Sequence, residues 1–368
     1  MMNRRPPADW VTQLSDIAAV FAAARRGRAG CCGRSAGGHP LWCIHYGERR
    51  LPTHRATYNS AVASGDPGNY YRRAGKRPHV LIFAAIHGLE LEGTAAVMDL
   101  IRLLETGEVQ GFDPADAEAI AGLASDVSMT LIPIANPDGR MRHVEIDALL
   151  GFDLEKARYR MQGAWADGSI AGWPEVKAVH PVAPARVKHL GAYFNDGGIN
   201  PMHDSFPVLL SPENQALFKL VDAERPDFIL SLHGGTNVTN HLVPPAFVPP
   251  YVMRHNAAVS RRLAEWSRGA GLPLIDSFAD MPADGAVQPG ELDSFNLMSA
   301  LHHYCGAVVL VYECNQGLAV IDTLQLDYAG MRRAHGGLFR VLLEHAVATA
   351  DMELRSFGLQ PARKAVRA

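Results

Sequence analysis

Short apolar runs alternate with longer segments of helical periodicity along most of the chain. Runs of this length bounded by polar residues predict buried strands, and the longer segments predict helices. The predicted strands are residues 41–46, 80–86, 127–134, 228–232 and 307–312. The predicted helices are residues 9–26, 91–104, 114–124, 212–224, 252–270, 292–304 and 323–350. Strands that alternate with helices indicate one α/β domain with a mostly parallel or mixed sheet.

Three segments interrupt this alternation and suggest how the chain is organised. Residues 27–38 are rich in glycine and predict a loop, and residues 60–78 predict a long polar connection. Residues 140–210 show little periodicity, so we expect a large insertion across one rim of the sheet. The predicted organisation is an N-terminal helix and loop at 1–30, one main domain at 31–350, and a tail at 351–368.

Composition narrows the class of protein. Of the 368 residues, 48% are hydrophobic and 20% are charged, which is typical of a globular protein. The net charge of −3 predicts no general attraction to nucleic acid or to an anionic membrane. The 5 cysteines are too few and too scattered for a disulfide scaffold. No apolar stretch has the length of a signal peptide or a membrane span, so we expect a cytoplasmic protein.

Polar side chains follow four of the predicted strands at the points where the strands end. His87-Gly88-Leu89-Glu90 follows the strand at 80–86, and Asn136-Pro137-Asp138-Gly139 follows the strand at 127–134. His233 follows residues 228–232, and Glu313 follows residues 307–312. If these strands run parallel, all four polar ends meet at the carboxyl edge of the sheet, where ligands bind in open α/β sheets.

These residue types are those of a catalytic zinc site. His87 and Glu90 are three positions apart in a turn that leads into a helix, and His233 can add a third ligand. Two histidines and one glutamate with an open fourth position are typical of a site for one catalytic zinc ion. Zinc lowers the pKa of its water towards about 7, and Glu313 is placed to act as general base. Each feature alone has a structural explanation, but their joint occurrence favours the metal site.

Five motifs in order along the chain carry a family resemblance. They are Gly33-Arg34-Ser35-Ala36-Gly37-Gly38-His39-Pro40-Leu41, Ala85–Glu90, Asn136–Gly139, Ser211-Pro212-Glu213 with Arg225-Pro226-Asp227 through His233, and Val311-Tyr312-Glu313. Together they resemble the zinc metallocarboxypeptidases, the carboxypeptidase A/B family in the broad sense, in a divergent bacterial-type member. The resemblance implies a three-layer α/β/α sandwich around a twisted mixed sheet of about eight strands. It also implies that the domain at 31–350 removes a C-terminal residue from a peptide or peptide-like substrate.

The resemblance also assigns roles around the metal. Zinc and Glu313 would activate water against a peptide or amide carbonyl, with an arginine after Asn136–Gly139 facing the oxyanion. Arg140 and Arg142 are both candidates, and we favour Arg142. The family holds the substrate carboxylate with an Asn-Arg pair. Here Asn200 is followed by Pro201, which has no charge, so His203 or Arg140 would have to substitute.

Other assignments stay open in the sequence. Tyr251 and Tyr304 are candidates for the tyrosine that closes over substrate in the family. The chain could also be an amidase or deacylase for a small N-acyl compound, as in the succinylglutamate desuccinylase and aspartoacylase group. That group also uses an H-x-x-E pair and a distant histidine, but the Asn-Pro-Asp-Gly match favours a carboxypeptidase. A third hypothesis, an inactive binding module with the same fold, is disfavoured because all four catalytic side chains are retained.

Overall fold

A computed structural model describes most of the chain. The described residues are 5–48, 56–64, 77–177, 180–206, 208, 210–235, 240–282, 285, 294–318 and 326–350. The predicted tail at 351–368 lies outside them, as do parts of the segments predicted at 60–78, 292–304 and 323–350.

The described residues form one mixed sheet of seven strands and a separate two-stranded sheet. In spatial order the large sheet is β1 (Arg28–Arg34), β2 (Pro40–Tyr46), β4 (Ser128–Ile132), β3 (His79–Ala84), β7 (Phe228–Gly235), β9 (Val308–Asn315) and β8 (His241–Val243). The four central strands β4, β3, β7 and β9 are parallel. Strands β1, β2 and β8 run antiparallel to their neighbours. The mixed sheet is as predicted, with seven strands in the described residues against the expected eight.

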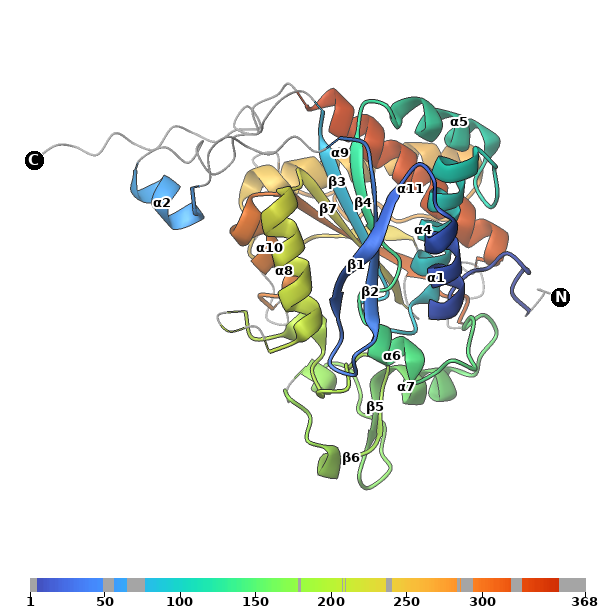
Figure 1. The fold of residues 1–368 in the computed structure, drawn as a ribbon, viewed down its shortest axis with the longest axis vertical. Helices are drawn as coiled ribbons and strands as arrows, with labels where there is room; N and C mark the ends of the chain where they lie inside the picture. The colour runs from blue at the N-terminus through green and yellow to red at the C-terminus, as the bar shows by residue number, and fades with distance from the viewer. Residues whose placement is uncertain are drawn as a thin grey trace, which may run out of the picture.

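Helices cover both faces of this sheet (Figure 1). Helices α8 (Pro212–Glu224) and α10 (Leu297–Cys305) pack together on one face. Helices α4 (Leu91–Thr106), α9 (Pro250–Ala270) and α11 (Tyr328–Ala348) cover the other face, and α5 (Pro114–Leu123) packs on α11. Two shorter helices complete this part of the fold, α1 (Leu14–Ala23) beside β1 and β2, and α2 (Tyr58–Ala63). The architecture is the expected three-layer α/β/α sandwich.

The central strands are buried on both faces, which explains their uninterrupted apolar sequences. Every residue of β3 and every residue of β4 is buried. Parallel strands covered by helices on both sides have this pattern, in contrast to the alternation of a half-exposed strand. Of the three polar side chains within these strands, His79 and Thr130 both bond the buried carboxylate of Glu224 at the end of α8, and Ser128 bonds His79.

The glycine-rich segment at 27–38 was predicted to be a loop, and this prediction was wrong for its first half. Residues 28–34 form β1, which pairs with β2 and shifts register between Cys31 and Gly33. An edge strand has one partner and tolerates glycine and bulges better than a central strand does. The glycine signal therefore marked an irregular edge strand.

The segment at 140–210 is more ordered than its sequence indicates. It contains α6 (Pro137–Met141) at its start, α7 (Leu154–Gln162), and the hairpin of β5 (Gly163–Trp165) with β6 (Val187–Leu190). Its apolar side chains form a second buried cluster that includes Leu89 and Leu91 beside α4. This cluster holds the segment beyond the ends of the central strands, where it is visible below the sheet in Figure 1. It thus forms one wall of the region that the strand ends face.

Within the described part of the chain, no helix combines the length and apolar character needed to cross a membrane.

Candidate active site

The parallel strands bring the predicted polar ends to one edge of the sheet. His87 follows β3, and its carbonyl accepts a hydrogen bond from the backbone N–H of Glu90, which closes the turn before α4. His233 lies near the end of β7 and pairs in register with Glu313 of β9. Paired residues of adjacent strands point to the same face of the sheet. His233 and Glu313 therefore face the same side of the same cleft.

Three side chains meet closely enough to share one metal ion. Glu90 Oε1 lies 2.8 Å from Nδ1 of His87, and Glu90 Oε2 lies 3.1 Å from Nδ1 of His233. One ligand atom from each of the three residues lies within 4.8 Å of the other two. All three side chains are buried. Two imidazoles and one carboxylate are the donor set of catalytic zinc sites.

Contacts behind the histidines fix how their rings point. His233 Nε2 lies 2.8 Å from the hydroxyl of Ser231, so a proton on Nε2 leaves the Nδ1 lone pair facing Glu90. The His87 ring stacks on Tyr193 with centroids 4.0 Å apart and an angle of 19°. The His87 Nε2 atom is buried without a hydrogen-bond partner among the described residues. These contacts hold both Nδ1 atoms toward one point, and the residues fit a zinc ion.

The pKa shifts of Glu90 and His233 also fit a site for a cation. Burial disfavours the charged carboxylate of Glu90, but the charges and hydrogen bonds of His87 and His233 outweigh it and lower the Glu90 pKa to about 2. Burial likewise opposes protonation of His233, yet the hydrogen bond to Glu90 raises its pKa. The carboxylate of Glu90 thus faces two imidazole nitrogens at the place that a divalent cation would take.

Glu313 has the properties of a general base beside this group. Burial raises its pKa to about 7, and the negative charge of Glu90 adds to this effect while the charge of His233 opposes it. A catalytic base is most effective when its pKa lies near the working pH. Glu313 lies outside the three-residue donor group, so it is free to exchange protons.

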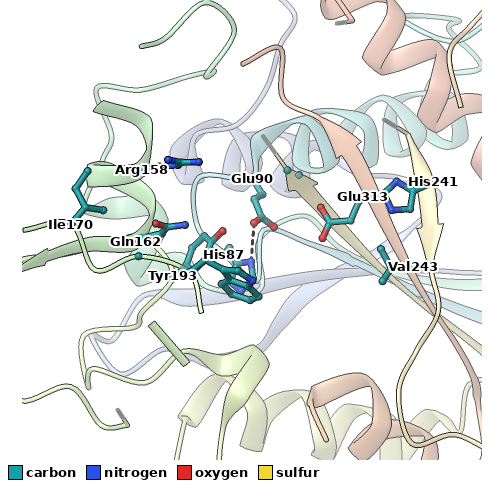
Figure 2. Close-up of a pocket in the computed structure, with 13 residues that line it drawn as sticks. His87, Glu90, Arg158, Gln162, Ile170, Tyr193, His241, Val243 and Glu313 are labelled. Atoms are coloured by element: carbon teal, nitrogen blue, oxygen red, sulfur yellow. Dashed lines mark hydrogen bonds and ion pairs between the residues drawn. The ribbon is translucent and has the colours of Figure 1, made fainter. Parts of the chain in front are cut away.

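These residues open into a pocket of about 710 Å³. Its lining residues are His87, Glu90, Arg158, Gln162, Ile170, Gly172, Trp173, Tyr193, Gly234, Gly235, His241, Val243 and Glu313. Figure 2 shows Glu313 and His241 on one side of Glu90, and Arg158, Gln162 and Ile170 on the other side. The strand ends form the first wall, and the segment at 140–210 forms the second.

Comparison with known proteins identifies the family. The sequence profile of the zinc carboxypeptidases matches residues 25–258, which include His87, Glu90 and His233. The chain belongs to the zinc carboxypeptidase family. It is therefore a hydrolase of the metallocarboxypeptidase type. Glu313 lies beyond the matched residues, and its position rests on the pairing of β9 with β7.

Solved structures show the same fold at low sequence identity. A metallo-carboxypeptidase from Burkholderia cenocepacia is 14% identical, with a TM-score of 0.55 over 90% of this chain and 69% of that chain. Thrombin activatable fibrinolysis inhibitor (TAFI) is 10% identical, with a TM-score of 0.51 over 91% of this chain and 76% of that chain. No curated protein matches the sequence.

Neither arginine predicted to face the oxyanion reaches the zinc carboxypeptidase pocket. The Arg140 side chain is fully buried and donates from Nε to the carbonyl of Thr12 at 2.9 Å and from Nη1 to that of His143 at 2.7 Å. Arg142 Nη1 donates to the carbonyls of Gly191 and Phe194, at 2.9 and 3.0 Å. Arg142 Nη2 donates to Asp196. Both guanidinium groups are used to hold loops together, so neither faces the reacting atoms.

The predicted carboxylate-binding residues do not line the pocket either. Asn200 is buried, and its Oδ1 accepts a hydrogen bond from the N–H of Met202 at 3.1 Å. Burial lowers the pKa of His203 to about 3, an effect strengthened by the charge of Lys177 and of nearby histidines. A neutral imidazole gives a carboxylate no charged partner. Pro201 opens a buried 3-10 turn over Pro201–His203, so no cation stands at this position.

Sequence reasoning missed the arginine that does line the pocket. Arg158 and Gln162 lie four residues apart on α7, which places them on the same face of the helix. The four-residue spacing is visible in the sequence, but it lies in a segment that was predicted to be irregular, so no helix was expected there. Tyr193 was missed for the same reason. Of the two candidate tyrosines, Tyr251 is buried on α9 and Tyr304 packs against Phe218, and neither lines the pocket.

Proposed function

We propose that this zinc carboxypeptidase cleaves a peptide or amide bond in the cleft between the strand ends and α7. One observation carries this proposal. His87 and Glu90 line a pocket that also contains a carboxylate with a raised pKa, and the buried His233 completes their donor group. A perturbed acid beside a metal donor set in a cleft is the arrangement that hydrolysis requires.

In this proposal His87, Glu90 and His233 hold one zinc ion. Zinc, when bound, supplies Lewis acidity that lowers the pKa of water and polarises a carbonyl. Glu313 accepts the proton of the attacking water and passes it to the leaving amine. Burial raises the pKa of Glu313 to about 7, and a nearby bound cation would lower it and favour the ionised carboxylate at neutral pH.

The role once assigned to Arg142 or Arg140 falls to Arg158. It is the arginine among the residues that line the pocket, and it lies across the cleft from Glu313 (Figure 2). A cation that lines the pocket stabilises the negative charge that develops on the carbonyl oxygen. The guanidinium of Arg158 would donate to that oxygen, while Gln162 on the same helix face contacts the substrate.

The substrate class rests on what surrounds this cleft. Trp173, Tyr193 and Ile170 offer apolar contact area on the wall formed by residues 140–210. With Arg158 committed to the oxyanion, no second arginine or lysine lines the pocket within the described residues. This observation gives some support to the alternative, an amidase or deacylase for a small N-acyl compound. We favour a peptide or peptide-like substrate.

A set of variants tests the mechanism. We expect Glu313→Gln to lower kcat by about 10³-fold or more while the protein keeps one equivalent of zinc, because general acid–base catalysis is lost but the ligands remain. Metal content is measured by elemental analysis beside the rate. Glu118→Gln, an exposed acid on α5, serves as the matched control. Zinc below about half an equivalent in the wild type, not restored by added metal, would contradict the proposal, and loss of zinc in Glu313→Gln would contradict the role of Glu313.

The substrate class is tested with matched pairs of peptides. Each pair has the same sequence with a free or an amidated C-terminus. A carboxypeptidase is expected to cleave only the free form. Equal rates on both forms, or preference for short N-acyl amino acids, would support the amidase alternative.

A further inference from the structure

A second cluster of reactive side chains lies away from the zinc site, at the edge of the sheet formed by β1 and β2. Cys43 and His45 are two residues apart on β2, so their side chains share one face. The sulfur of Cys43 lies 3.6 Å from Nε2 of His45. Nδ1 of His45 lies 2.9 Å from Oε1 of Glu224 at the C-terminal end of α8. Sulfur, imidazole and carboxylate thus form a continuous chain.

The contacts of Glu224 set the direction of proton transfer in this chain. The hydroxyl of Thr130 donates to Oε2 of Glu224 at 2.6 Å, and His79 Nε2 lies 3.0 Å from the same oxygen. Nδ1 of His45 thus faces two acceptors, Oε1 of Glu224 at 2.9 Å and the hydroxyl oxygen of Thr130 at 2.9 Å, so its proton has a partner on this side. With that proton on Nδ1, Nε2 is the atom that takes the thiol proton of Cys43. The buried carboxylate then stabilises the imidazolium.

The electrostatics agree with this geometry. The adjoining thiol of Cys32 and the hydrogen bond to His45 lower the pKa of Cys43 to about 6, although burial opposes the change. Burial also opposes protonation of His45, but Cys43 and Glu224 outweigh it and raise the His45 pKa to about 9. The pair is ionised at neutral pH. A thiolate is the reactive form of cysteine.

A second sulfur is placed to react with the first. Cys32 lies at the register shift of the edge strand β1 and is half-buried, and its thiol adjoins that of Cys43. Contact with Cys43 and burial raise the pKa of Cys32, so it remains a thiol while Cys43 is a thiolate. Cys31 beside it is exposed. The edge of the sheet therefore holds the buried sulfur of Cys43, which contacts His45, beside the half-buried sulfur of Cys32.

We propose that Cys32 and Cys43 form a peroxide-reactive site, in which His45 and Glu224 activate Cys43 and oxidation joins the two sulfurs across β1 and β2. The Cys43 thiolate attacks one oxygen of hydrogen peroxide, the O–O bond breaks, and the departing hydroxide takes the proton held by His45 to become water. The sulfur of Cys32 then attacks the sulfenic sulfur of Cys43. The S–O bond breaks, and the hydroxide leaves as water with the proton of Cys32. Two thiols are oxidised, and one peroxide is reduced to two waters.

Peptide mapping of the zinc-loaded protein treated with hydrogen peroxide at pH 7 tests the site. Trypsin cuts after Arg28, Arg34 and Arg49, so Cys32 and Cys43 fall in different peptides. We expect a disulfide between these peptides in the wild type and in Cys31→Ser. Cys32→Ser should instead leave a sulfenic acid on Cys43 that dimedone traps. A disulfide that requires Cys31, or only disulfides between molecules, would overturn the proposal.

A matched pair of histidine variants tests the activation. His45→Gln is expected to slow oxidation of Cys43 on the order of tenfold at pH 7, because the thiolate loses its cation. His79→Gln removes the other histidine bound to Glu224 but touches no sulfur, so the rate should stay unchanged. Equal rates in wild type and His45→Gln would contradict the role of His45.

The wild-type protein gives an independent measurement if His45→Gln does not fold. The titratable groups that face Cys43 are Cys32 on β1, His45 on its own strand and Glu224 on α8. We expect the oxidation rate to be half-maximal near pH 6 and level at pH 7 to 8. A rate that rises tenfold per pH unit up to pH 8 would show an ordinary thiol and overturn the proposal.

Discussion

Gly88 shows how closely two loops of the active site approach each other. A Cβ atom built on Gly88 would lie 2.3 Å from the backbone nitrogen of Arg140 and 2.3 Å from the carbonyl carbon of Gly139. The backbone N–H of Gly88 also donates to the carbonyl of Ala192. The turn that carries His87 and Glu90 therefore rests directly on backbone, which cannot move aside as a flexible side chain can.

We predict that Gly88→Ala weakens metal binding by at least tenfold, because the added methyl group must displace the turn between His87 and Glu90. Zinc affinity by competition with a chromogenic chelator measures the effect. Gly122→Ala is the control, since a Cβ there would meet nothing within 4 Å. Unchanged zinc affinity in Gly88→Ala would show that the turn adjusts without moving its ligands.

Substitutions at Arg140 and Arg158 should have different effects: one should lower stability and the other should lower activity. Arg158→Gln removes a cation that lines the pocket, so we expect kcat/KM to fall by about 10²-fold or more with little change in stability. Arg140→Gln removes buried hydrogen bonds to Thr12 and His143, so we expect the free energy of unfolding to fall by about 1–3 kcal/mol. Steady-state kinetics and denaturant titration measure the two effects. The reverse pattern would restore the assignment of Arg140 to the oxyanion.

At the scale of elements, α8 was predicted most closely. Its first turn caps the helix and also bonds two distant loops. Ser211 Oγ accepts a hydrogen bond from Asn214 N–H at 3.3 Å and donates to Glu213 Oε2 at 2.6 Å. Glu213 in turn accepts from the N–H of Ala36 and from the amide of Asn195. Its buried carboxylate therefore joins the loop after β1 to the loop before residue 200. The Ser-Pro-Glu sequence specified this cap locally, because every group involved in it lies within one turn.

We predict that Ser211→Ala lowers the free energy of unfolding by about 1–2 kcal/mol, since the helix loses its cap and Glu213 loses one donor. Urea titration followed by circular dichroism measures the change. Ser15→Ala, at an exposed serine of α1, should stay within about 0.5 kcal/mol of wild type. Equal stability of the two variants would mean that Ser211 has no capping role in solution.

At the scale of the whole molecule, the sheet places a buried carboxylate where its charge is unfavourable without metal. Burial and Glu90 raise the pKa of Glu313 to about 7 from its ordinary value of 4.5. The folded state therefore binds more protons than the unfolded state between these values. Stability of the metal-free protein should fall as pH rises from about 4.5 to 7, and zinc should restore it.

We predict that Glu313→Gln stabilises the metal-free protein by about 1–3 kcal/mol at pH 8 and has little effect at pH 4, where the carboxyl is already neutral. Urea denaturation after chelation of zinc measures the difference at both pH values. Adding zinc should narrow the difference at pH 8, because the ion favours the ionised form. A stabilisation that is equal at both pH values would show that the charge of Glu313 is not its cause.

The sequence by itself determined the central strands, the main helices and the positions of His87, Glu90, His233 and Glu313. These features are local: an apolar run, a periodic segment, or a polar residue at a strand end can be recognised from neighbouring residues alone. Parallel pairing then brings the four side chains together without further information.

Only the tertiary structure decided which cation faces the pocket and how the edge strand pairs. No local sequence pattern distinguishes Arg140, Arg142 and Arg158. They differ in the groups that surround each guanidinium after folding. The chain from Cys43 through His45 to Glu224 likewise joins groups from β2 and α8, which lie far apart along the chain. Contacts of this kind depend on how distant elements pack, and no pattern among neighbouring residues encodes them.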